Sequence, residues 1–250
     1  MRGKWESFAS RNPIPAVISY HAEESVILRH TRSVSVQAPQ VKLSQLGRLD
    51  ERRAAHLDGM AVAGDVGDKL ADATLKSTNV GAVFVSAIGG FENNDLNRLD
   101  KLFALTESLP EAQTGLTSAL GWVSPKGLQG AISALLGHNE LFRKRLGIAA
   151  CGMHMVDPGA SRAAAIASPD SLLRVQGLRF AGELGRRDML LKCIEQIKGA
   201  RIDLGQRSGS QWRVARATAT AGHIGLASFG LVMYIDHVYI NNQVRQWLCK

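Results

Sequence analysis

Two short segments near the N-terminus combine histidine with carboxylates, residue types that can bind a metal ion or transfer a proton. The first contains His21 and Glu24, and the second contains His56 and Asp58. Residues i and i+3 share one face of a helix, so His21 and Glu24 could bind one ion, whereas His56 and Asp58, at i and i+2, diverge. A metal site needs three or four converging ligands, and no third ligand stands at a recognised spacing. We therefore expect no bound metal and no cofactor.

A structural role is the alternative that these residues favour. Polar residues expected on a helix around residues 20–30 can pair with charged residues of a helix expected over 43–63. The first set is His21, Glu23, Glu24 and Arg29, and the second is Asp50, Glu51, Arg52, Arg53 and Asp58. We predict that such pairs, with His56 among the participants, hold together an N-terminal helical cap.

Nucleophilic catalysis has no recognisable motif in the sequence. There is no G-x-S-x-G elbow, and the cysteine nearest a histidine, Cys151 beside His154, lies in an apolar helical pattern that predicts a buried thiol. The segment 81–90, GAVFVSAIGG, has neither a P-loop lysine nor the G-x-G-x-x-G order, and indicates close helix packing instead. We predict that the protein is not an enzyme.

Clusters of basic residues could bind an acidic partner. When the chain is shifted against itself by 31 residues, Arg143 and Arg174 hold equivalent places and Arg213 nearly does. Such a ladder could bind an acidic protein, neutralise the phosphates of a nucleic acid as in the HEAT-like DNA glycosylases, or serve only to join neighbouring repeats. Aromatic residues for base stacking are scarce, which favours the protein partner. The predicted partner-binding residues are Arg143, Lys144, Arg145, Arg174, Arg179, Arg213 and Arg216.

The same 31-residue shift predicts the elements that position these residues. It aligns small residues at Ala119, Ala150 and Ala181, where two helices could approach closely. The pattern is clearest over 168–197, where two apolar runs of helical period flank a short polar break and Asp170 can cap the first helix. Neither helix alone can cover its apolar stripe, so neighbouring hairpins must cover it. A non-repetitive helical domain rich in alanine and glycine is the alternative.

The predicted fold is therefore all-α: a HEAT-like α-solenoid of helical hairpins with an irregular helical N-terminal cap. Residues 1–79 form the cap and residues 80–250 the repeat array, in one continuous structural unit. Within the cap, Gly64 should end the helix over 43–63 and Asp65 should cap the next. The expected hairpins join 80–91 to 96–109, 111–122 to 127–136, 140–155 to 160–167, and the two runs of 168–197, with a fifth unit over 211–234.

Composition suggests the surroundings in which the protein works. Its formal net charge of +8 favours acidic partners without determining the fold. Cys151, Cys193 and Cys249 lack C-x-x-C spacing and suit a reducing compartment. The N-terminus does not resemble a signal peptide, and the longest apolar stretch, 224–235, is too short to span a bilayer. We expect a cytoplasmic protein without membrane contact, and its oligomeric state stays open.

Three N-terminal segments resemble an uncharacterised family of bacterial HEAT-repeat proteins. They are HAEE at 21–24, LDER at 49–52 and HLDGMAVAG at 56–64, in which Met60 replaces a leucine of the family pattern. The resemblance is close in the N-terminal half and loose in the repeats. Genes of this family often lie near type VI secretion clusters, which implies an accessory, adaptor or immunity role. The family has no assigned activity and so implies no catalytic residues; its members are usually longer, which implies that terminal repeats are missing here.

Three functions follow as hypotheses. The first is a non-enzymatic HEAT-repeat scaffold or adaptor that binds a protein with an acidic surface, accessory to a type VI secretion system. The second is a cytoplasmic immunity protein that binds and neutralises a toxin. The third is a nucleic-acid-binding protein like the helical DNA glycosylases, which would require a carboxylate beside an aromatic residue in a basic groove.

Overall fold

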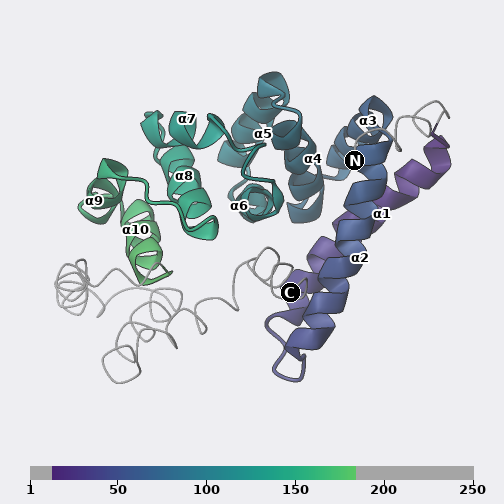
Figure 1. Ribbon diagram of the computed structural model, residues 1–250, viewed down its shortest axis with the longest axis horizontal. Coiled ribbons are helices and arrows are strands. Elements are labelled where there is room, and N and C mark those ends of the chain that lie inside the picture. The colour runs from purple at the N-terminus through teal and green to yellow at the C-terminus, as the bar shows by residue number, and fades with distance from the viewer. Residues whose placement is uncertain (1–12, 184–250) are drawn as a thin grey trace. The chain divides into compact units, whose positions relative to one another are not determined.

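The structure is a computed structural model that describes residues 13–183 of the chain. These residues form ten α-helices, two short 3₁₀ helices and no β-strand (Figure 1), so the prediction of an all-α fold is confirmed for them. They fall into two compact units, and the boundary along the chain lies between Leu128 and Gln129. The expected fifth repeat and the second helix of the 168–197 hairpin lie outside the described residues.

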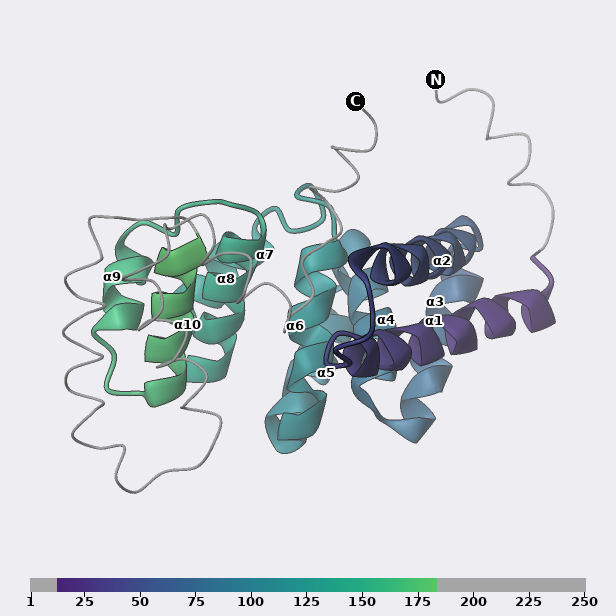
Figure 2. The same ribbon diagram turned by 90° about the horizontal axis from the view of Figure 1, so that it is seen from below.

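Three helices open the first unit: α1 (Pro15–Ser35), α2 (Leu43–Val62) and α3 (Asp65–Ala73). Pro15 stands in the first turn of α1, where its fixed φ suits the start of a helix. α1 and α2 pack side by side along their length (Figures 1 and 2). The bounds of α2 agree to within a residue with the predicted helix.

Three residues on one side of α2 are buried along the helix. Leu46, Arg53 and Met60 follow one another at seven-residue spacing, and all three are buried. Gly64 ends the helix with a φ of +54°, a conformation that glycine adopts readily. The prediction that Asp65 caps α3 is wrong, because the turn at Gly64 makes Asp65 the first helical residue rather than the residue before the helix.

The most deeply buried helix of the first unit is α4 (Val80–Glu92), which packs against α1, α3, α5 (Leu96–Ser108) and α6 (Gln113–Trp122). It is apolar on nearly every side, as a helix enclosed by others must be. Asn79 caps it by accepting hydrogen bonds from the first backbone amides. The helices over residues 80–122 thus form one compact unit with those of the expected cap.

Close approach and an ion-pair network around the buried side chain of Arg98 fix the helices around α4. A Cβ atom on Gly115 of α6 would lie 2.4 Å from the carbonyl oxygen of Val80, so the two backbones can meet only where this side chain is absent. Arg98 of α5 forms ion pairs with Asp68 at 2.6 Å and Asp72 at 2.8 Å. Since both aspartates belong to α3, Arg98 joins α5 to α3 across the end of α4.

The described part of the second unit contains α7 (Ala131–Gly137), α8 (Leu141–Met153), α9 (Ala160–Ile166) and α10 (Ser171–Glu183) (Figure 2). Asp170 caps α10 as predicted, since its Oδ1 atom accepts a hydrogen bond from the Leu173 amide at 2.6 Å. The core of this part is formed by Ile148, Cys151, Ala165, Leu173 and Phe180.

Cys151 is buried in this core, as predicted. Burial raises the pKa of its thiol to about 11, so the unreactive protonated form dominates near neutral pH.

The predicted pairing of helices 140–155 and 160–167 as one hairpin is wrong, although both helices are present. α9 packs on α10, and α8 packs on α7 and α10. Glycine explains this pairing, because a Cβ atom on Gly177 of α10 would lie 3.0 Å from the backbone nitrogen of Ile166 in α9. Gly147 of α8 lies equally close to Leu136 of α7. Each short helix therefore pairs with the long helix that follows it.

The alanines aligned by the 31-residue shift, Ala119, Ala150 and Ala181, are all buried in α6, α8 and α10. Among residues 13–183, no helix is both long and apolar enough to cross a membrane.

Candidate functional site

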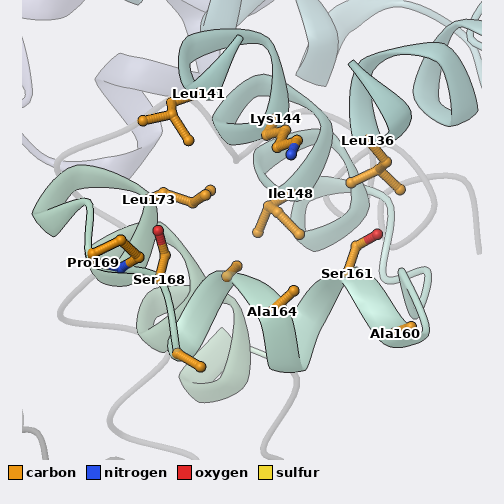
Figure 3. Close-up of a pocket in the computed structure, with 12 residues that line it drawn as sticks. Leu136, Leu141, Lys144, Ile148, Ala160, Ser161, Ala164, Ser168, Pro169 and Leu173 are labelled. Atoms are coloured by element: carbon orange, nitrogen blue, oxygen red, sulfur yellow. The ribbon is translucent and has the colours of Figure 1, made fainter. Parts of the chain in front are cut away.

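A groove of about 450 Å³ lies between α8 and α9 in the second unit (Figure 3). The α8 wall carries Leu141, Lys144 and Ile148, and Leu173 of α10 closes the space between the two helices. Leu136 of α7 lies at the opposite end. The groove thus occupies the place where the sequence predicted a closed hairpin.

Small side chains on α9 leave this space unfilled. Ala160 and Ala164 stand one helical turn apart on the α9 wall, and Ala165 lies beside them. The methyl groups of Ala160 and Ala164 are short, whereas longer aliphatic side chains at these places would fill such a gap in a closed core. Because α9 packs on α10, the groove stays open.

The walls of the groove are mainly apolar, and Lys144 is the charged residue among those that line it. It stands on the α8 wall, across from Ser161 and Ala164 on α9 (Figure 3). The lining residues include no carboxylate, histidine or cysteine; their polar side chains are those of Lys144, Ser161 and Ser168. The chemistry of the groove suits an apolar group that lies next to a negative charge.

Arg174 supports this groove without lining it. Its Nη1 atom donates hydrogen bonds to the carbonyl oxygens of Ser168 at 2.7 Å and Pro169 at 3.3 Å. Ser168 and Pro169 form part of the groove lining in the link between α9 and α10. Arg174, predicted to bind a partner, therefore holds a segment of the groove wall in place.

The other predicted partner-binding residues have different surroundings. Arg145 lies with its guanidinium carbon 5.5 Å from the centre of the Phe142 ring, and burial lowers its pKa while the charge of Asp170 opposes that shift. Arg143 and Arg179 are half-buried. Arg213 and Arg216 lie outside the described residues. Among the predicted cations that the structure describes, Lys144 is thus the one in the groove.

The predicted structural cluster centres on Asp50 of α2. Its Oδ1 atom accepts hydrogen bonds from Arg32 of α1 at 2.8 Å and from Arg53 at 2.7 Å, and all three side chains are buried. Arg29 lies nearby and donates hydrogen bonds to the hydroxyls of Ser33 and Ser118. Asp50 thus joins α1 to α2 through buried side chains. It does not pair with residues on the exposed side of either helix.

Aromatic rings complete this cluster. The Arg53 guanidinium lies 3.9 Å from the centre of the Trp122 ring and 5.0 Å from that of Phe84, which gives cation–π contacts in a buried site. Burial lowers the pKa of Arg29 and Arg53, because few charges compensate the guanidinium groups there. The cluster joins α1, α2, α4 and α6 and is enclosed by them.

The remaining cap residues lie nearer the surface. The Nδ1 atoms of His21 and His56 lie 2.9 Å apart, and Oε2 of Glu24 lies 3.7 Å from Nη2 of Arg52. Asp58 is exposed. Within residues 13–183, no group of three or more histidine, cysteine or acidic side chains converges in a way that could hold a metal ion.

The sequence prediction did not include Arg32, Phe84 and Trp122, which also belong to the buried cluster. Arg32 follows Arg29 by three residues on the same face as the small buried residues Ala22 and Ser25, and this spacing signals a buried cation pair on α1. Trp122 carries no such signal, because α6 is far from α1 and α2 in sequence. The run of alanines on α9 is a feature of the sequence that could have indicated the groove.

Comparisons of the chain with models of known protein families, with curated proteins and with solved structures found no match.

Proposed function

We propose that the chain is a non-enzymatic helical-repeat protein that binds another protein through the α8–α9 groove. The bound segment would place an apolar side chain between the two helices and an acidic side chain beside Lys144. The observation that carries this proposal is the combination of apolar walls and one lysine in a single open groove. Burial of apolar surface supplies affinity in such contacts, and charge supplies orientation.

The helix pattern supports a HEAT-like solenoid as the scaffold for this groove. Helices α6, α8 and α10 end at Trp122, Met153 and Glu183, at intervals close to 31 residues. Within each unit the long helices pack on one another, α4 on α6 and α8 on α10. Extended repeat arrays commonly present such surfaces to protein partners.

The resemblance of the N-terminal segments to bacterial HEAT-repeat proteins supports a cytoplasmic role beside a type VI secretion system. An adaptor would bind a component of that apparatus, and an immunity protein would bind a toxin. Both proteins would use the same groove and differ only in the partner.

Affinity capture with paired bait proteins tests this function. The baits are the wild-type chain, Ala164→Leu, which fills the groove, and Ala163→Leu, which alters an exposed alanine of the same helix that does not line it. A secretion component or a toxin held by the wild type and by Ala163→Leu, and lost from Ala164→Leu, supports the proposal. Equal capture by all three baits, or capture abolished by nuclease treatment, contradicts it.

A further inference from the structure

The outward side of α1 carries a heptad pattern that the proposed function does not use. Its exposed residues between 16 and 34 include six that follow one another at alternating spacings of four and three residues. They are Ala16, Tyr20, Glu23, Ile27, His30 and Val34, here called the α1 seam. This spacing places them along one line, which is the seam geometry of paired helices.

The α1 seam lies opposite the buried face of the helix. Ile18, Ala22, Ser25, Arg29 and Arg32 point into the first unit and are buried. Tyr20, Ile27 and Val34 are instead 55%, 54% and 58% exposed, although large apolar side chains at seven-residue spacing are typical of a helix that packs on a partner.

We propose that the α1 seam binds the α1 seam of a second copy of this chain in antiparallel orientation. Glu23 and His30 lie on either side of Ile27, near the middle of the seam. A two-fold axis there brings Glu23 of one copy near His30 of the other, twice, so that imidazole can donate to carboxylate. Parallel pairing would instead bring glutamate near glutamate and histidine near histidine.

Antiparallel pairing also brings apolar seam residues together. With the two-fold axis at Ile27, Val34 of one copy lies near Tyr20 of the other, on each side of the central pair of Ile27 side chains. The paired part of the seam, residues 20–34, extends over about 21 Å of helix, and two helices of this length bury on the order of 1,000 Å² at most, which is at the lower limit for specific association. The dimer should therefore be weak, with a dissociation constant on the order of micromolar.

Sedimentation equilibrium of the full chain, at concentrations up to about 200 µM, tests the proposal. The wild type should dimerise, and Ile27→Lys should raise the dissociation constant at least about tenfold. Leu172→Lys is the matched control, because Leu172 of α10 is 57% exposed and lies outside the seam; it should leave the dimer unchanged.

A charge exchange tests the orientation. His30→Glu places two carboxylates together and should weaken the dimer, and the double variant Glu23→Lys with His30→Glu should restore it if the helices are antiparallel. Failure of the double variant to restore a weakened dimer contradicts that orientation. A chain that stays monomeric at every concentration, or a dimer unaffected by Ile27→Lys, overturns the proposal. A monomer whose melting temperature falls with Ile27→Lys also overturns it, since the seam would then be covered within one chain.

Discussion

The Nδ1 atoms of His21 and His56 lie 2.9 Å apart, so these two nitrogens can share a single proton. One ring must donate through Nδ1–H while the other accepts through a bare nitrogen. Protonation of the accepting ring removes the hydrogen bond and sets two positive charges against each other. This contact between α1 and α2 is therefore favourable only while at least one histidine is neutral.

Acidification should weaken the fold through His56. Burial and the proximity of His21 hold the pKa of His56 below its ordinary value of 6.5. The unfolded chain therefore takes up this proton first, and the stabilising effect of neutral His56 is fully present above pH 6.5 and lost as the pH falls through the folded-state pKa.

Urea denaturation between about pH 7.5 and 5 measures this loss. His56→Gln should reduce the pH dependence, whereas His138→Gln, in the second unit, should preserve it. If the free energy of unfolding of His56→Gln falls with pH as steeply as that of the wild type, the pH dependence belongs to other groups.

Asp50 should contribute more to stability than any exposed acid of α2. Asp50→Asn removes the carboxylate that accepts from both Arg32 and Arg53 and leaves buried guanidinium charge uncompensated, which should lower the free energy of unfolding by about 3–5 kcal/mol. Asp58→Asn, on the exposed side of the same helix, should change it by less than about 0.5 kcal/mol. Similar midpoints for the two variants in chemical denaturation would contradict the role given to Asp50.

Local patterns in the sequence were sufficient to predict most helices. Asp170 caps a helix and Gly64 ends one, as predicted, because capping and positive φ depend on the residues of the turn itself. Pairing between helices was harder to predict. The contact of α9 with α10 instead of α8 depends on how closely Gly177 lets two backbones approach, and the 31-residue period is the same for either arrangement.

Glycines at helix contacts should tolerate no side chain, in contrast to glycines in open positions. Gly115→Ala places a Cβ atom against the Val80 carbonyl oxygen and should lower the free energy of unfolding by about 1–3 kcal/mol. Gly47→Ala, in α2 with no atom within 4 Å of the new Cβ, should raise it by about 0.5–1 kcal/mol through the better helix propensity of alanine. Thermal unfolding of both variants should show melting temperatures that shift in opposite directions, and a common direction would disprove the explanation.

The groove and the buried arginine cluster show what sequence reasoning could not reach. The basic run at 143–145 was selected for its charge, yet the structure gives each described residue different surroundings: Lys144 lines the groove and Arg145 stacks near Phe142. Rotation by about 100° per residue around a helix separates neighbours in this way. Trp122 meets Arg53 only through the packing of α6 near α2, which no local pattern records.

The affinity of the groove for an apolar, acidic peptide is the most direct test of the proposed function. A peptide selected from a random library on the wild-type chain should pair an aromatic or aliphatic residue with aspartate or glutamate. In fluorescence titration its dissociation constant should rise at least about tenfold with Ala164→Leu and with Lys144→Glu, and stay within about twofold with Ala163→Leu and with Lys101→Glu, an exposed lysine of α5. Equal affinity for all five proteins, or selection of peptides without acidic residues, would contradict binding at this groove.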